Sequence, residues 1–479
     1  MGWLALGLLV KALLFVWYVQ DNAGAKHMGR WALWDGDMWE YVDPIESLLR
    51  GEGFHPDHRM PGYGVPYLLL RLVFDQPQAC DVLTLLQLLL ATVTTYLLAR
   101  GLVTVTSHRR LFLPTYALLL LSAFHSTVEA VMINESFTTS ALALHVLCYM
   151  RYRSSGHNGW LVGAGALLAW AVFMRPIYGP LLLVIPLLEL LRRHRHWRQR
   201  LATVVFFGLP FAVADAAWTI RNHRLYGGFH PLTNHGSFNP IFSSLPYYGV
   251  LYWVQTYGGN AYWWDPSADV RWYGFEPDAG GGTDQPIPGV PEPPGDVYVG
   301  GITPDSLAHM AMVMRSSRGP EVPEAERDSI AVVLLQMAQR WRTAYAREKP
   351  FHYQVVSRLR LLKHETIHSG TTHLFQRPFA ELGPAARAWK LLQAALYWWV
   401  LLTGCVAAAV VVWRVRRAEA VLAAVVVLYG VVACPFIMRM AEIRYLVPIF
   451  PLMLLCAAWA TDALMHRLRR DRRTETSPP

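Results

Sequence analysis

Charged residues are scarce in this chain: they make up 16% of its 479 residues, against 53% that are hydrophobic. This scarcity argues against an ordinary soluble protein, because the apolar residues come in long blocks rather than short core segments. Six blocks have roughly the 17–25 residues that a helix needs to cross a membrane, and they cover residues 2–20, 81–105, 201–220, 397–413, 418–437 and 445–464. Four shorter blocks cover residues 111–126, 135–149, 160–174 and 178–191. The sequence therefore predicts an all-α polytopic membrane protein with about ten transmembrane helices.

Cysteine is also sparse, and its distribution argues against a disulfide-stapled external domain. The chain has five cysteines and none of them lies between residues 223 and 388. Their spacing matches no metal-binding pattern, so we interpret them as small buried hydrophobic residues. No short internal repeat is present, which argues against a solenoid.

Basic residues exceed acidic ones, 43 to 34, and the excess follows a topological pattern. Many of them form clusters between the apolar blocks, at residues 109–110, 151–153, 192–200, 414–417 and 467–473. Because cytoplasmic loops of membrane proteins are enriched in Lys and Arg, these clusters predict cytoplasmic termini and an external segment 223–388. The net charge of +9 then requires no nucleic-acid partner.

This topology predicts four parts. Residues 1–222 form an N-terminal transmembrane module whose first external loop spans residues 21–79, and residues 223–388 form an external (periplasmic) domain of mixed secondary structure. Residues 389–466 form the C-terminal transmembrane helices, and residues 467–479 form a disordered cytoplasmic tail. The Arg- and Ala-rich composition and the short loops suggest a prokaryotic inner or plasma membrane.

Acidic and arginine side chains collect at the predicted external ends of the apolar blocks. Asp37 lies in the first external loop. The ends of apolar blocks carry the others, which are Glu135, Arg175, Arg221 and Arg444. Carboxylates can take a proton from an acceptor hydroxyl, while arginines can hold a departing phosphate through paired N–H donors. This combination suits chemistry on a lipid-phosphate donor.

The motifs around these residues resemble a known family. They are Asp37-Met-Trp-Glu-Tyr41, Leu48-Leu-Arg-Gly-Glu-Gly-Phe54, Arg59-Met-Pro-Gly-Tyr63, Asn134-Glu-Ser-Phe137, Met174-Arg-Pro176, Trp218-Thr-Ile-Arg-Asn222 and Arg444-Tyr-Leu-Val-Pro448. In this order they resemble the GT-C glycosyltransferases, and most closely the protein mannosyltransferase and aminoarabinose transferase relatives. The chain departs from the family's usual pattern at Gly64-Val65-Pro66, where relatives often have Pro directly after the Tyr, and at Pro44.

The resemblance implies an inverting transferase that moves a sugar from a polyprenyl-phosphate carrier to a glycan, lipid or protein acceptor on the outer face of the membrane. It assigns catalysis to Asp37, as base or acceptor contact, with support from Glu135. The implied donor-phosphate ligands are Arg59, Arg175, Arg221 and Arg444. The residues suggested to contact the sugar or acceptor are Tyr41, Tyr63, Asn222 and Glu442.

Simpler interpretations stand beside each of these roles. Asp37 could cap an amphipathic helix that follows it. Pro44 would either kink this helix or be its first residue, with Asp43 as the cap. Alternatively, Asp35 and Asp37 together could hold a divalent cation. The metal requirement is therefore open. Glu135 could stabilise a helix start, and the arginines could anchor lipid headgroups. Lys11, inside the first apolar block, could face a polar bundle interior, but it is expected to snorkel toward the interface.

Other functions also remain open. A transporter or flippase for lipid-linked saccharides would place charges near mid-span and repeat its halves, and neither pattern is present. A polysaccharide ligase or polymerase would use larger pyrophosphate-linked donors, and a non-catalytic envelope assembly protein would have no need of Asp37 and Glu135.

Overall fold

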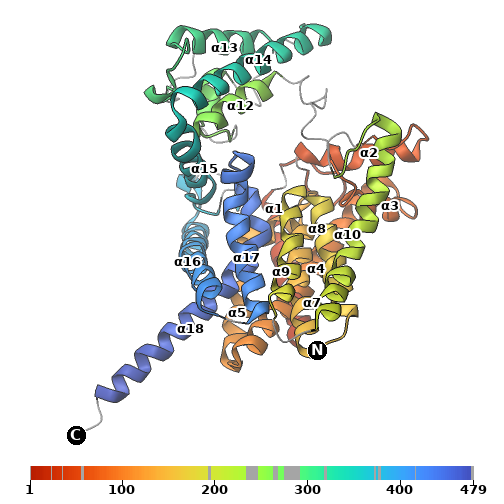
Figure 1. The fold of residues 1–479 in the computed structure, drawn as a ribbon, viewed down its shortest axis with the longest axis vertical. Coiled ribbons are helices and arrows are strands. Elements are labelled where there is room, and N and C mark those ends of the chain that lie inside the picture. Colours follow the sequence, from red (N-terminus) through yellow and green to blue (C-terminus); the bar gives the residue numbers. More distant parts are fainter. Residues whose placement is uncertain are drawn as a thin grey trace. The chain divides into compact units, whose positions relative to one another are not determined.

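The computed structural model describes residues 2–22, 24–34, 36–55, 59–192, 196–232, 246–262, 268–274, 292–317, 321–371, 374–375, 379–415 and 417–475. Over these residues the chain is helical, with isolated β-bridges but no strand (Figure 1). The chain divides into two compact units. Unit 1 comprises Met1–Thr233, Ser369–Gly430 and Arg444–Pro479, and unit 2 comprises Asn234–His368 and Val431–Ile443.

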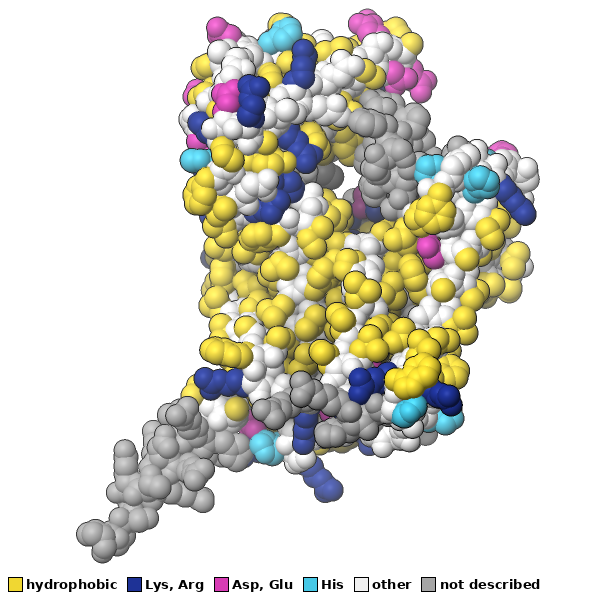
Figure 2. Space-filling view, in the orientation of Figure 1, with side chains coloured by type: hydrophobic (Ala, Val, Ile, Leu, Met, Phe, Trp, Pro, Cys, Tyr) yellow, Lys and Arg dark blue, Asp and Glu magenta, His cyan; other side chains and the backbone are white. Residues whose placement is uncertain are grey.

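Unit 1 contains the long apolar helices. Its helices, with α17 continuing into unit 2, are α1 (Gly2–Asp21), α2 (Trp39–Leu49), α3 (Gly64–Arg71), α4 (Gln76–Thr106), α5 (Phe112–Leu121), α6 (Ala123–Ser126), α7 (Glu135–Ser155), α8 (Gly159–Met174), α9 (Val184–Leu190), α10 (Trp197–Tyr226), α16 (Pro384–Arg414), α17 (Ala418–Val432) and α18 (Phe450–Glu475). Figure 2 shows hydrophobic side chains along these helices and Lys and Arg near one end of them, the distribution that a bilayer requires.

Six of the described helical segments are long and apolar enough to span a membrane, or seven if the bent pair α5–α6 counts as one span. The chain is thus a multi-pass membrane protein. The four shorter predicted blocks are also helical, but α8, for example, has only 16 residues. The count of about ten spans therefore stays a prediction.

The bent span between α5 and α6 shows how unit 1 accommodates a break in an apolar helix. The two segments differ in direction by 54° at Ser122. The side-chain amide of Gln393 in α16 accepts a hydrogen bond from the Ala123 N–H at 2.9 Å and donates one to the Leu121 carbonyl at 3.0 Å. Because a break exposes backbone groups that lipid cannot satisfy, Gln393 takes the place of the missing helical bonds.

Lys11 does not snorkel, so that prediction is wrong. Its ammonium group is buried, ion-pairs with Glu129 after α6, and donates to the Ser126 hydroxyl at 3.0 Å. Pairing with a buried carboxylate offsets the cost of placing a charge inside the helix bundle. The pair ties α1 to the segment that follows the bent span.

The first loop is held against α4 by Asp81 of that helix. Its carboxylate accepts backbone N–H bonds from Arg30, Trp31 and Ala32 at 2.7–3.0 Å. The Leu33 N–H also donates to the Ala130 carbonyl at 2.9 Å. These bonds fix the chain just before Asp37.

The amphipathic helix predicted in this loop is α2, which buries Tyr41, Val42, Pro44 and Ile45. It begins at Trp39 and continues through Pro44. The alternative start at Pro44, with Asp43 as its cap, is therefore wrong.

Unit 2 has its own hydrophobic core. It contains α12 (Tyr247–Tyr257), α13 (Pro304–Ser316), α14 (Glu324–Glu348) and α15 (Ser357–Thr366). Trp253 of α12 is fully buried there and donates to the Tyr273 hydroxyl at 3.0 Å. The predicted mixed secondary structure differs from the part of this segment that the structure describes, which is helical. The longest helix of unit 2, α14, contributes Leu334, Met337 and Tyr345 to this core.

The predicted disordered tail also differs from the structure, because α18 runs on to Glu475. Its basic residues continue the helix of the preceding apolar block, and Arg is a good helix former. Residues 476–479 lie outside the described part.

Candidate active site

Asp37 lies between two arginines from distant parts of the chain. Its carboxylate Oδ2 is 2.9 Å from Nη2 of Arg444 and 3.3 Å from Nη2 of Arg59. Arg59 also ion-pairs with Glu40, one turn after Asp37. The Asp37 side chain is 26% exposed, so solvent or a ligand can reach it.

A second acid–arginine pair adjoins the first. Glu135 is buried and ion-pairs with Arg175, which is itself 8% exposed. Arg444 connects the pairs, because its Nε lies 3.8 Å from Glu135 Oε1 while its Nη2 contacts Asp37. The predicted site residues Asp37, Arg59, Arg444, Glu135 and Arg175 thus form one continuous network, and all of them belong to unit 1.

Arg59 lies in the loop before α3, and the other four members of the network lie at or near the end of a helical element. Asp37 lies in a short 3₁₀ helix (Gly36–Met38), and Glu135 opens α7. Arg175 is the C-cap residue of α8, and Arg444 lies in the 3₁₀ segment Ile443–Ile449. Helix ends of this kind leave side chains free to converge.

Asn134 aligns the buried pair, although only its neighbour Glu135 was predicted as a site residue. Its amide nitrogen donates to the Met174 carbonyl at 2.8 Å, and its Oδ1 accepts from Nε of Arg175 at 2.9 Å. Its position directly before Glu135, in the motif of residues 134–137, is the sequence signal that could have identified it.

Gly62 explains the motif around Arg59. Its N–H donates to the Phe173 carbonyl at 3.1 Å, and an added Cβ would lie 2.5 Å from that backbone. Only glycine permits this approach of the loop to the end of α8. The contact brings the loop that carries Arg59 toward the Arg175 end of that helix.

Aromatic rings line the arginines. The Arg59 guanidinium lies 5.1 Å from the Tyr41 ring, and that of Arg175 lies 4.3 Å from the Tyr445 ring. Tyr63 packs against Tyr41 at 5.0 Å, and its hydroxyl donates to Gln87 at 3.0 Å. Tyr41 and Tyr63 are buried, so they support the site more than they offer a free surface.

The electrostatics of Asp37 follow from this setting. Burial raises the pKa of its carboxyl, but Arg444 and Arg59 outweigh burial and lower the pKa from 3.8 to about 2. The carboxylate is therefore ionised at neutral pH but is a weak base while both arginines hold it.

Three predicted residues lie outside this network, and two of them make other contacts. Arg221 donates to the Phe54 carbonyl at 2.5 Å and to Asn222 Oδ1 at 2.8 Å. Asn222 donates to the His230 carbonyl at 3.0 Å. Both therefore anchor loops near the end of α10. Glu442 belongs to unit 2.

The simpler interpretations of Asp37 find little support. The N-cap residue of α2 is Met38, and no side chain caps that helix. Asp35 lies outside the described residues, among which no group of three or more His, Cys, Asp or Glu side chains is arranged to hold a metal. A role in binding a cation stays untested.

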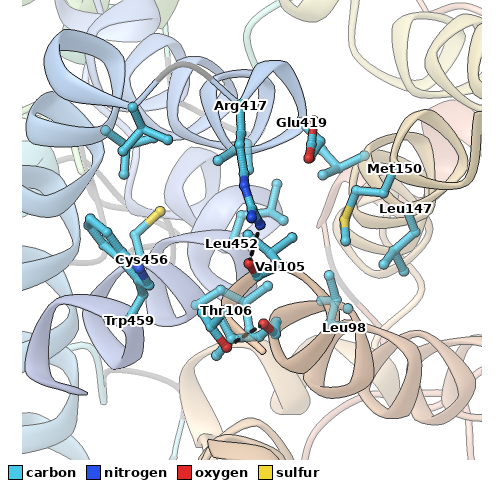
Figure 3. A pocket seen from close by; sticks show the side chains of 18 of the residues that line it. Leu98, Val105, Thr106, Leu147, Met150, Arg417, Glu419, Leu452, Cys456 and Trp459 are labelled. Atoms are coloured by element: carbon cyan, nitrogen blue, oxygen red, sulfur yellow. Dashed lines mark hydrogen bonds between the residues drawn. The ribbon is translucent and has the colours of Figure 1, made fainter. Parts of the chain in front are cut away.

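A separate apolar cavity of about 300 Å³ lies between α4, α7, α17 and α18 (Figure 3). Leu98, Met150, Leu452 and Trp459 are among its lining residues, and Arg417 donates across it to the Val105 carbonyl. None of the ten predicted site residues lines it. It is not the candidate active site.

Comparison with known proteins adds little to this geometry. No protein family and no curated protein matches the chain. Two solved structures are similar over most of it, both of ArnT from Cupriavidus metallidurans. The apo structure has 13% identity and a TM-score of 0.32, covering 95% of this chain and 77% of that one. The undecaprenyl phosphate-bound structure has 12% identity and a TM-score of 0.32, covering 96% and 78%. Similarity this low carries no argument about function.

Proposed function

We propose that this protein is a glycosyltransferase that takes a sugar from a polyprenyl-phosphate donor and passes it, with inversion, to an acceptor hydroxyl. The supporting observation is the network in which Asp37 contacts Arg59 and Arg444 while Glu135 pairs with Arg175. Residues from five separate motifs meet in it, as a shared role in one reaction requires.

In the proposed reaction Asp37 removes the proton from the acceptor hydroxyl. The acceptor oxygen then attacks the anomeric carbon as the bond from that carbon to the phosphate oxygen breaks. The phosphate leaves with the electron pair, and guanidinium N–H donors stabilise its charge. The acceptor can be a glycan, a lipid or a protein.

The resting ion pairs suggest how the base becomes active. The donor phosphate is a diester with one negative charge, and its two free oxygens can accept paired N–H bonds from the same guanidinium groups that hold the carboxylate. When Arg59 and Arg444 turn to the phosphate, the pKa of Asp37 rises from about 2, because the arginines no longer stabilise the carboxylate. Asp37 would therefore become a stronger base only when the donor, with its bond from sugar to phosphate, is bound.

The test is transfer of labelled sugar from a panel of polyprenyl-phosphate monosaccharides by the purified full-length protein. We expect the wild type to consume a donor, and Asp37→Asn to lose at least about 100-fold in rate, the usual contribution of a general base. Glu52→Gln, which breaks an exposed ion pair with Arg50 in the same loop, is the matched control. If no donor is consumed and labelled lipid instead crosses proteoliposome membranes, the protein is a transporter.

A further inference from the structure

Unit 2 gathers three arginines, two of which contact the same tyrosine and the third of which repels Arg439 electrostatically. They are Arg342 of α14, Arg358 of α15, and Arg439, which follows a π-helical turn (Ala433–Met438). The Arg439 guanidinium lies 3.6 Å from the Tyr353 ring. Nε of Arg342 donates to the Tyr353 hydroxyl at 2.8 Å. We call these three residues the arginine trio.

Arg439 is held in place by an unusual backbone. Its φ is +58°, a left-handed conformation that costs energy in a residue other than glycine. Its Nη2 donates to the Tyr353 carbonyl at 2.6 Å and to the Ser357 hydroxyl at 2.8 Å, which fixes the guanidinium against α15. These contacts hold the positively charged guanidinium of Arg439 in one defined position.

The trio lacks a counter-charge among the described residues. No Asp or Glu in the described part of the chain forms an ion pair with Arg342, Arg358 or Arg439. By contrast, Arg360, two residues after Arg358, pairs with Asp296 at 2.9 Å. Nη1 of Arg439 and Nε of Arg358 are also buried without an acceptor in the described part of the chain.

The like charges raise the free energy of the empty arrangement. Burial and then repulsion from Arg358 and Arg342 lower the pKa of Arg439 to about 10, although Tyr353 opposes the change. Contacts with Tyr353 account for the positions of Arg439 and Arg342, but not for the presence of a third cation, Arg358, near them without a carboxylate. An oxyanion would relieve the repulsion and accept the unused N–H groups.

We propose that the arginine trio is a binding site for a phosphate-type oxyanion, carried by a phospholipid headgroup or by a phosphorylated soluble ligand. Guanidinium forks match the geometry of phosphate oxygens, which favours this class of anion over a simple halide. The site lies in unit 2 and shares no residue with the Asp37 network, so the inference does not depend on the proposed transferase activity.

Arg358→Gln is the decisive variant, because Arg358 contributes repulsion in the empty site. Without phosphate, the variant should unfold at the same temperature as the wild type or higher. Inorganic phosphate, added at constant ionic strength with chloride as the reference, should stabilise the full-length wild type and bind it calorimetrically. The variant should bind phosphate at least about tenfold more weakly, the effect of one lost charge-assisted contact.

Two controls separate this site from others. Arg347→Gln removes an exposed arginine of α14 that pairs with Glu348, and it should leave the phosphate response unchanged. Arg444→Gln removes any phosphate bound at the Asp37 network, and the component that depends on Arg358 should persist. An equal phosphate response in wild type and Arg358→Gln would overturn the proposal and leave the trio as a structural stack.

The source of the anion is decided with the protein in nanodiscs. If the ligand is a headgroup, phosphatidylglycerol in phosphatidylcholine discs should stabilise the wild type more than Arg358→Gln. If it is a soluble phosphate ester, inorganic phosphate should do so in pure phosphatidylcholine discs and phosphatidylglycerol should not. Absence of any difference between the two proteins under both conditions would refute the site.

Discussion

Removing the carboxylate of Asp37 should make the protein bind donor phosphate more tightly while it abolishes transfer. In the resting site Asp37 occupies Arg59 and Arg444, the groups that the phosphate needs. Asp37→Asn keeps the side chain's size but removes the competing charge. A residue that merely shaped the pocket would, when altered, weaken binding instead.

The size of the effect follows from the pKa of Asp37. That pKa falls from 3.8 to about 2, and one pH unit corresponds to about 1.4 kcal/mol, so the site as a whole, arginines against burial, favours the ionised carboxylate by about 2 kcal/mol. A phosphate that must displace this carboxylate loses up to the same amount, which is about 30-fold in affinity. We therefore expect Asp37→Asn to bind up to about 30-fold more tightly at pH 7.

Equilibrium binding of tritiated, sugar-free polyprenyl phosphate to purified protein measures this directly. Glu52→Gln, which frees the exposed Arg50, should leave the affinity unchanged and reports any general effect of removing a negative charge from the loop. Weaker binding by Asp37→Asn, or equal binding by the wild type and Asp37→Asn, would refute the idea that Asp37 and the phosphate compete for these arginines.

Three further outcomes are expected. Because the pKa of Asp37 is about 2 in the free protein, the pH profile of kcat/KM should show no acidic limb from this group above about pH 4. The acidic limb of kcat should lie at higher pH, because bound phosphate draws the arginines away from Asp37. Acidic limbs at the same pH in both profiles would contradict this. Gly62→Ala should cost about 1–3 kcal/mol in thermal unfolding because its Cβ meets the Phe173 backbone, while Gly179→Ala, with open space around it, should not. Lys11→Met should lower the free energy of unfolding by about 3–5 kcal/mol, because it leaves Glu129 buried and unpaired. Adding Glu129→Gln should restore most of the lost stability. Unchanged stability of the single variant would show that the pair does not hold α1.

Some parts of the candidate site were predictable because they rest on local patterns. Asp37, Arg59, Glu135, Arg175 and Arg444 could be named from short motifs at the ends of apolar blocks, and the structure brings them together. The same reasoning placed Arg221 with them, but a side chain at a helix end can turn toward any neighbouring loop.

The sequence by itself determined that the chain is helical and crosses a membrane. Long apolar blocks leave few alternatives, because lipid offers no hydrogen bonds and each segment must satisfy its own backbone. The partner of Lys11 and the packing of unit 2 were beyond this reasoning, because the pattern of one helix does not show which other element its polar or apolar face contacts.

Only the tertiary structure decided which charges meet. Arg444 reaches Asp37 across 407 residues of chain, and Lys11 reaches Glu129 across 118. The arginine trio likewise joins α14, α15 and the turn after α17. An ion pair depends on the distance between two groups in space, and no local spacing encodes that distance when the partners lie on different helices.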